Sequence, residues 1–150
     1  MNDEWSEWID ESFGWTRIPD LGDVTLYGSD DLNPNDINQG QLGNCWIISA
    51  VSAVAEHGGR IKNLILNDSI SQSGIYGVNM YALGVPYTEY VDDWIPTQQG
   101  YPLFAWIGAD GSVWPSIVEK AFAKRYGSYQ HMNGGAAATG VSVLTGSPFF

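Results

Sequence analysis

Gln39-Gly40-Gln41-Leu42-Gly43-Asn44-Cys45-Trp46 is the stretch that decides the fold, and it contains the only cysteine of the chain. The apolar run from Trp46 to Ala55 predicts a helix that begins at this cysteine, and Asn44 is of a type preferred at a helix N-cap. Because the run is apolar nearly all round, we expect the helix to be buried. A helix N-terminus favours the thiolate, the reactive form of cysteine, so the pattern indicates a rigidly held nucleophile.

Two readings of these residues stay open at this point. A free cysteine is often only a small buried hydrophobe, and a lone glutamine is often a solvated loop residue. The flanking residues favour a nucleophile, because Gly43-Asn44-Cys45-Trp46 keeps the order glycine, small residue, cysteine and aromatic residue of papain-like proteases, with Asn in the small position. The Gln39 amide would then donate a hydrogen bond to the oxyanion that forms when a thiolate attacks a carbonyl.

The segment from Asn33 to Trp46 resembles the active-site signature of the calpain family of cysteine proteases. Further matches follow in the family's order, at Tyr90–Thr97, Trp114–Lys124, Tyr126–Tyr129 and Gly134-Gly135. The resemblance covers roughly residues 15–147. It implies an α+β, papain-like fold, with a helical subdomain that bears the nucleophile and a small antiparallel β element.

The resemblance also implies a function, that of a calpain-like, calcium-dependent cysteine endopeptidase that acts on protein substrates. Cys45 would attack the peptide carbonyl, while the Gln39 side chain and the Cys45 backbone N–H stabilise the oxyanion. Trp46 would form a wall of the cleft, and Gly134 and Gly135 would line the substrate, since close backbone approach leaves no room for a Cβ atom.

The chain matches only the first half of a calpain core. A cysteine protease needs a histidine base and an orienting Asn or Asp, which in papain-like enzymes follow the cysteine by roughly 130–150 residues. His57 follows the predicted helix about three turns from the sulfur, and His131 stands in a loop-like stretch that the family pattern does not use for the base. We therefore expect a second protease subdomain to supply the His and Asn, and the chain alone to be inactive.

Calcium binding is a further implication of the resemblance. The family's site in this subdomain uses carbonyls at positions matching Ser29 and Asp31, and an acid matching Asp36. Its second acid, just before the downstream tryptophan, is replaced by Ser112. Asp110 is a candidate substitute, but losing a carboxylate weakens a site for Ca²⁺, which takes six to eight oxygen ligands.

Composition restricts the partners. The net charge of −11 disfavours nucleic acid and anionic membranes. No stretch approaches the roughly 20 apolar residues of a membrane span, the N-terminus has no signal-like run, and the single cysteine fits a reducing compartment. We therefore expect a cytoplasmic (intracellular) protein. The alternative from another class is a non-catalytic, calpain-like regulatory or protein-interaction module.

The chain divides into an acidic, Trp-containing N-terminal strap over residues 1–38, expected to be irregular, and the first protease subdomain over residues 39–150. Asp92 and Asp93 are consecutive strand residues and should therefore point to opposite faces, which argues against a paired acid/base role. The predicted elements after the cysteine helix are a short helix over 60–66, strands over 74–82 and 85–91 joined by a Gly84 turn, a third strand over 103–106, and an amphipathic helix over 114–126.

Overall fold

The computed structural model describes residues 11–28, 32, 37–40 and 42–148. Its helices are α1 (Cys45–Ala55), α2 (Gly58–Leu64), α3 (Trp114–Tyr126) and α4 (Ala137–Thr145), with short 3₁₀ turns at Ile18–Leu21 and Gln130–Met132. Its strands are β1 (Phe13–Arg17), β2 (Ile75–Ala82), β3 (Val85–Asp92), β4 (Trp94–Gln98) and β5 (Tyr101–Pro102). The fold is therefore α+β, as the sequence predicts, and all strand pairs are antiparallel.

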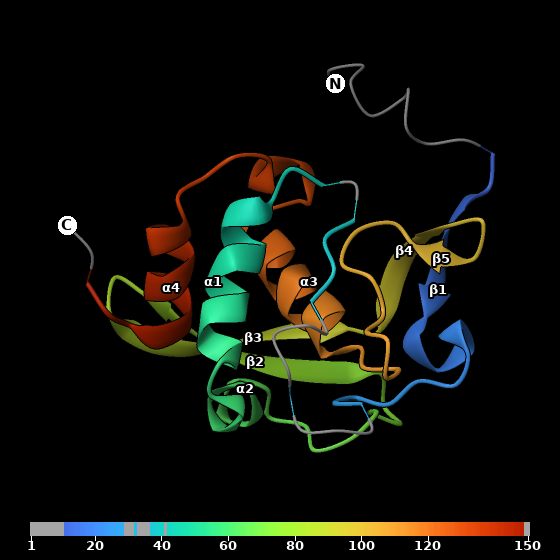
Figure 1. Cartoon of the computed structure of the whole chain (residues 1–150), viewed down its shortest axis with the longest axis horizontal. Coiled ribbons are helices and arrows are strands. Elements are labelled where there is room, and N and C mark those ends of the chain that lie inside the picture. The colour runs from blue at the N-terminus through green and yellow to red at the C-terminus, as the bar shows by residue number, and fades with distance from the viewer. Residues whose placement is uncertain (1–10, 29–31, 33–36, 41, 149–150) are drawn as a thin grey trace.

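Two small sheets flank the helices. β2 and β3 form a hairpin that lies along the helical layer, whereas β1, β4 and β5 form a separate sheet at one side of the molecule (Figure 1). The hairpin turn uses Leu83 and Gly84, both with positive φ, which is the backbone shape that matches the twist of antiparallel strands. The Gly84 turn is thus confirmed.

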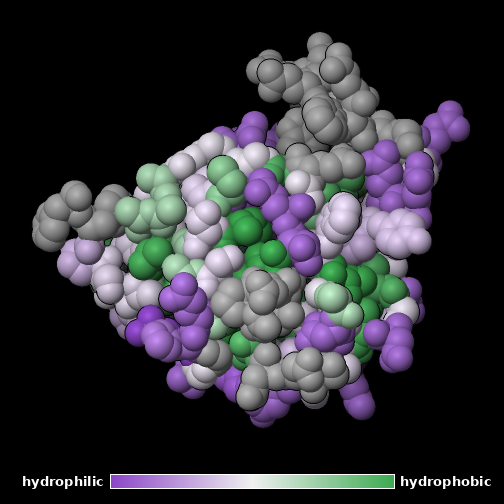
Figure 2. All heavy atoms as spheres, in the orientation of Figure 1, coloured by the Kyte–Doolittle hydropathy of each residue, from purple (hydrophilic) through white to green (hydrophobic). Residues whose placement is uncertain are grey.

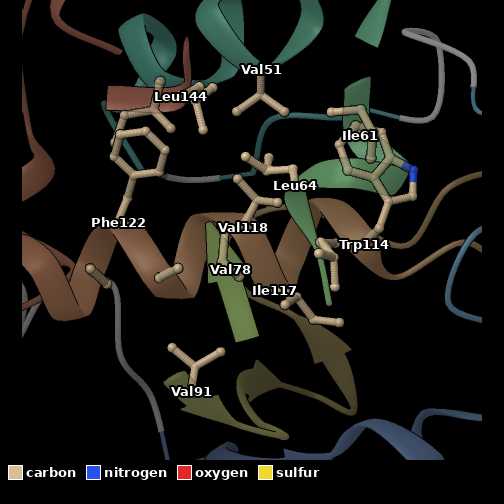
Figure 3. Packing of buried hydrophobic residues seen from close by; sticks show 14 of the residues in the cluster. Val51, Ile61, Leu64, Val78, Val91, Trp114, Ile117, Val118, Phe122 and Leu144 are labelled. Atoms are coloured by element: carbon tan, nitrogen blue, oxygen red, sulfur yellow. The ribbon is translucent and has the colours of Figure 1, made fainter. Parts of the chain in front are cut away.

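The most enclosed element is α3. The large apolar side chains of its first three turns are no more than 1% exposed: Trp114, Ile117, Val118 and Phe122. Figure 3 shows α3 with Val51 of α1 and Leu144 of α4 on one side and Val91 of β3 on the other. Each such side chain contributes about 1.5–3 kcal/mol when fully buried, so α3 is the centre of the core.

The helix predictions are confirmed closely. α3 has the predicted bounds, with Pro115 in its first turn and Gly127 in the left-handed conformation at its end, where glycine is favoured. α1 begins at Cys45 as predicted. α2 begins two residues earlier than expected, at Gly58, with His57 as its N-cap.

Two expectations about the strands are wrong. Leu103–Trp106 is not a strand, because its backbone groups bond in several directions: Leu103 N–H to Pro96, Trp106 N–H to Asn38, and Ala105 to α3 side chains. The described part of the N-terminal strap is only partly irregular, because residues 13–17 form β1 and pair with β4, whereas residues 22–28 form no named helix or strand. Trp15 within β1 is half exposed and lies near Lys120, rather than being buried in the core.

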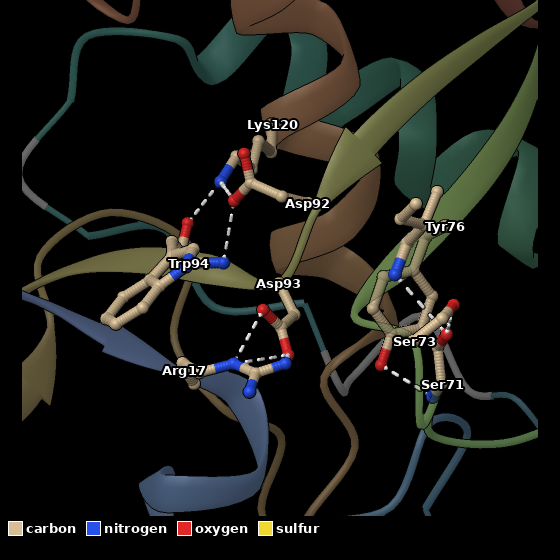
Figure 4. A network of polar contacts seen from close by, with 9 residues as sticks. Arg17, Ser71, Ser73, Tyr76, Asp92, Asp93, Trp94 and Lys120 are labelled. Atoms are coloured by element: carbon tan, nitrogen blue, oxygen red, sulfur yellow. Dashed lines mark hydrogen bonds and ion pairs between the residues drawn. The ribbon is translucent and has the colours of Figure 1, made fainter.

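Asp92 and Asp93 point in opposite directions, as predicted (Figure 4). Asp93 is buried and accepts hydrogen bonds from the Arg17 guanidinium at 2.8–3.1 Å, which ties β1 to the start of β4. Asp92 is exposed; it pairs with Lys120 at 2.5 Å and accepts the Trp94 N–H. Burial is the largest single influence on the pKa of Asp92 and raises it, but the hydrogen bonds from Lys120 and the Trp94 N–H together bring the pKa below its ordinary value.

We predict that Asp93→Ala lowers the free energy of unfolding by about 2 kcal/mol, because it removes a buried carboxylate and its hydrogen bonds. The matched Asp92→Ala change should cost less than about 1 kcal/mol, since that carboxylate is solvated. Urea unfolding of both variants measures the difference. Equal losses would contradict the assignment of Asp93 as the anchor of β1.

Candidate functional site

Cys45 is the first residue of α1, and its side chain is exposed. The residues behind it are buried on the core side of the helix, among them Trp46, Ile47, Ala50 and Val51. A thiol is thus presented at the surface by a helix that the core holds still. Figure 2 shows the face of the molecule seen in Figure 1, with hydrophobic residues near its middle and hydrophilic residues toward its edge.

Asn44 occupies the N-cap position, but its side chain makes no capping hydrogen bond. The expected capping interaction is therefore wrong in detail. Instead, the Asn44 Nδ2 donates to Glu119 of α3 at 2.5 Å, inside the core. The backbone N–H groups of Cys45 and Trp46 have no acceptor among the described residues.

Gln39 lies in the loop that leads to Cys45, six residues before it. The Gln39 side chain is exposed, and its Nε2 donates to the Leu42 carbonyl at 2.6 Å. This bond turns the amide onto its own loop, so the oxyanion role stays a prediction. The adjacent Gly40 is required by packing, because a Cβ there would lie 1.9 Å from the Phe104 carbonyl oxygen.

Trp46 packs inward. Its ring makes edge-to-face contacts with Phe122 and Tyr126 at centroid distances of 6.1 and 5.7 Å, and its Nε1 donates to the Met132 carbonyl. A Cβ at Gly135 would lie 2.5 Å from this ring. The structure thus gives Trp46 and Gly135 a packing role, and their contact with substrate stays a prediction.

Gly134 lies next to the loop before Cys45 (residues 38–44), called the nucleophile loop below. Its N–H donates to the Gly43 carbonyl at 2.9 Å, two residues before Cys45, and its φ is +82°. No atom lies within 4 Å of a Cβ built there, so its backbone conformation, rather than crowding, favours glycine. The structure therefore brings the predicted Gly134-Gly135 segment to the thiol end of α1.

Neither histidine has a described contact with Cys45. His57 lies beyond the far end of α1, about 16 Å along the axis at 1.5 Å per residue. His131 is exposed, and its Nδ1 lies 3.0 Å from the Tyr126 carbonyl oxygen. A groove of about 720 Å³ is lined by residues that include Val54, Tyr87 and Leu144, toward the end of α1 away from Cys45, so it is separate from the thiol.

Glu119 is the residue that the sequence analysis missed. It belongs to α3 and is only 3% exposed, and its two carboxylate oxygens accept hydrogen bonds from Asn44 Nδ2 and the Ala105 N–H. Burial raises the pKa of Glu119 to about 7, against the opposing effect of these two donors. Burial, with a smaller effect of the Glu119 charge, also raises the pKa of Tyr129 well above its usual value. No local signal pointed to Glu119, because it lies outside the apolar stripe of the 114–126 helix and is buried only because α3 is enclosed on more than that face.

The proposed calcium ligands Ser29, Asp31 and Asp36 lie outside the described residues. Asp110 and Ser112 are described. Asp110 Oδ1 accepts the Ser112 N–H at 3.0 Å, while Asp110 Oδ2 and Ser112 Oγ are buried without a partner in the described part of the chain. Within that part, no three His, Cys, Asp or Glu residues cluster as a metal site.

This α+β arrangement, with small antiparallel sheets and an exposed cysteine at the first residue of a buried helix, is that of a papain-like protease fold. The sequence profile described as calpain family cysteine protease matches residues 3–149. The chain therefore belongs to the calpain family.

Among curated relatives, the chain is 40% identical over 142 residues to the calpain-type cysteine protease ADL1 of Oryza sativa subsp. japonica, covering 94% of this chain and 6% of the relative. It is 40% identical over 119 residues to the calpain-type cysteine protease DEK1 of Arabidopsis thaliana, covering 79% and 6%. It is 34% identical over 140 residues to calpain-5 of Caenorhabditis elegans, covering 88% and 22%. The chain thus spans less than a quarter of the length of these relatives.

Glu119 predicts a pH dependence of stability. Its pKa of about 7 exceeds the ordinary 4.5, so between these values the native state binds more protons than the unfolded state. The free energy of unfolding should therefore fall as pH rises from about 4.5 to about 7, by at most about 3 kcal/mol. Glu119→Gln should remove this slope, as measured by urea unfolding between pH 4.5 and 8. The exposed Glu56→Gln change is the matched control and should keep the slope; an unchanged slope in Glu119→Gln would contradict the assignment.

Proposed function

We propose that this chain carries the nucleophile of a calpain-like cysteine endopeptidase. The observation that carries the proposal is the placement of Cys45: an exposed thiol at the first residue of a buried helix, with two backbone N–H groups that have no acceptor in the described part of the chain. Such N–H groups at a helix start are suited to a developing oxyanion. Membership of the calpain family supports the same reaction.

In the proposed reaction, the Cys45 thiolate adds to the carbonyl carbon of a peptide bond in a protein substrate. The carbonyl oxygen becomes an oxyanion that the Cys45 N–H stabilises, and the Gln39 amide joins it after turning away from the Leu42 carbonyl. A histidine that has taken the thiol proton gives it to the departing amine as the C–N bond breaks, and water then hydrolyses the thioester left on Cys45. We assign that histidine, and the Asn that orients it, to a second subdomain.

The location proposed for the protein is the cytoplasm. A single exposed, free cysteine is compatible with a reducing compartment. No helix in the described part of the chain combines the length and the apolar character needed to cross a membrane.

We predict that the purified 150-residue chain does not hydrolyse peptides, while iodoacetamide alkylates Cys45 faster than an unstructured cysteine at pH 7. Cys45→Ala supplies the blank for both assays, and the same chain in denaturant supplies the unstructured reference. An alkylation rate equal to that reference would favour the non-catalytic interaction module. Peptide turnover that disappears in Cys45→Ala would contradict the assignment of the base to another subdomain.

We further propose that the chain binds calcium through Asp110, with Ser29, Asp31 and Asp36 as its partners. The support is the buried Asp110 Oδ2, which has no partner in the described part of the chain, because carboxylate oxygens are preferred ligands of Ca²⁺. The backbone at Gly28 comes close to this oxygen, since a Cβ built on Gly28 would lie 1.6 Å from it. Ser29 follows Gly28 directly in the chain, and Asp31 comes two residues after Ser29. A bound ion would supply a positive charge that joins this segment to the 110–112 segment.

We expect calcium chloride at millimolar concentration to raise the melting temperature of the wild-type chain, because a ligand that binds only the native state stabilises it. Asp110→Asn should abolish this shift, whereas Glu56→Gln, at an exposed position after the end of α1, should retain it. Magnesium chloride at equal ionic strength controls for screening. A shift of the same size in Asp110→Asn would contradict the role of Asp110.

A further inference from the structure

Glu119 is a buried carboxylate whose two hydrogen-bond donors belong to two different loops. Its Oε1 accepts from Asn44 Nδ2 at 2.5 Å, and its Oε2 accepts the Ala105 N–H at 2.9 Å. Asn44 directly precedes Cys45, whereas Ala105 lies in the loop before α3. One side chain of the core helix therefore joins the nucleophile loop to the 103–106 loop.

The two loops also contact each other directly. The Trp106 N–H donates to the Asn38 carbonyl at 3.0 Å, and Gly40 lies so close to the Phe104 carbonyl that no Cβ fits between them. The 103–106 loop is itself held by α3, because Ser116 Oγ donates to the Ala105 carbonyl at 2.9 Å. Ser116 and Glu119, three residues apart on one helix face, thus satisfy both backbone polar groups of Ala105.

Stability alone does not account for Glu119. The described residues include no cation paired with it, and taking a carboxylate out of water costs several kcal/mol when no opposite charge offsets it. An apolar side chain would fill the same core position at lower cost. What the carboxylate adds is two acceptors, one that fixes the direction of Asn44 and one that holds the Ala105 N–H.

That direction matters at the start of α1. An N-cap Asn normally turns its side-chain oxygen onto the N–H groups of the first helical turn. Here the Asn44 side chain is held in the core by Glu119, and its Oδ1 is buried without a partner among the described residues. The Trp46 N–H, which such a cap would cover, therefore stays uncovered beside the Cys45 N–H, and the thiol and these donors keep a fixed relative orientation.

We propose that Glu119 is a positioning residue for the Cys45 nucleophile, acting through the Asn44 side chain that it holds in the core. This inference rests on the proposed function of Cys45. It differs from a purely structural role in one consequence: cutting the hydrogen bond between Asn44 and Glu119 changes the reactivity of Cys45 while the fold persists.

The test measures the second-order rate constant of Cys45 with iodoacetamide between pH 5 and 10 in folded chains. Asn44→Ala cuts the bond from the loop side, and Glu119→Leu cuts it from the helix side without leaving a buried unpaired acceptor. We expect both to react about tenfold more slowly than wild type at pH 7, because small displacements of a reacting group are costly. Glu119→Gln should recover most of the loss seen in Glu119→Leu. The new glutamine amide can accept the Ala105 N–H through its Oε1 and donate from its Nε2 to Asn44 Oδ1 once the Asn44 amide has turned.

Ser116→Ala is the matched control, since it removes a buried hydrogen bond of the same helix to the same Ala105 but leaves Asn44 bound. It should lower the melting temperature and keep the wild-type rate profile. Circular dichroism confirms that each chain is folded, and Glu119→Leu serves if Asn44→Ala does not fold.

Wild-type rates in folded Asn44→Ala or Glu119→Leu would overturn the positioning role, as would a faster reaction, which would show that Glu119 acts only as a nearby negative charge. A wild-type chain no faster than its denatured form would instead overturn the proposed function of Cys45. The two failures are therefore distinguishable.

Discussion

The structure depends on the enclosure of α3. Its apolar residues fill the space between α1 and α4 on one side and the β2–β3 hairpin on the other (Figure 3). Polar side chains on the enclosed faces of this helix cannot reach water, so the buried Ser116 and Glu119 must find partners in the protein. They find them in Ala105 and Asn44. The geometry of the nucleophile loop thus follows from satisfying the polar groups of the core helix.

The two buried carboxylates of the described residues are satisfied in different ways. Asp93 faces the Arg17 guanidinium, which offers charge and a fork of donors, and it fastens β1 to the remaining fold. Glu119 has only neutral donors, so burial raises its pKa to about 7, close to physiological pH. A charged partner such as the Arg17 guanidinium suits a permanent structural contact. Neutral donors leave the Glu119 carboxylate with a charge that responds to small changes around it. Glu119, the carboxylate with neutral donors, contacts Asn44, the residue directly before Cys45.

The sequence predicts the helices well because periodicity and caps are local. The 114–126 helix has its Pro start, its apolar stripe and its Gly end within one segment, and the Cys45 helix has a continuous apolar run. The strand pairing of β1 is not local, because Phe13–Arg17 finds its partner about eighty residues later. The 103–106 segment looks like a strand by composition, yet its partners are side chains of a helix that follows it. Pattern alone cannot place such contacts.

The same distinction explains the site. Cys45 is evident from its neighbours in sequence, and so is its position at a helix start. The partner of Asn44 is not, because local propensity assigns that side chain to capping, and only the packing of α3 beneath the loop draws it inward. Once Asn44 is drawn inward, the first N–H groups of α1 remain uncovered beside an exposed sulfur. The oxyanion role proposed for this helix start thus depends on a contact between Asn44 and Glu119 that only the packing of the core helix provides.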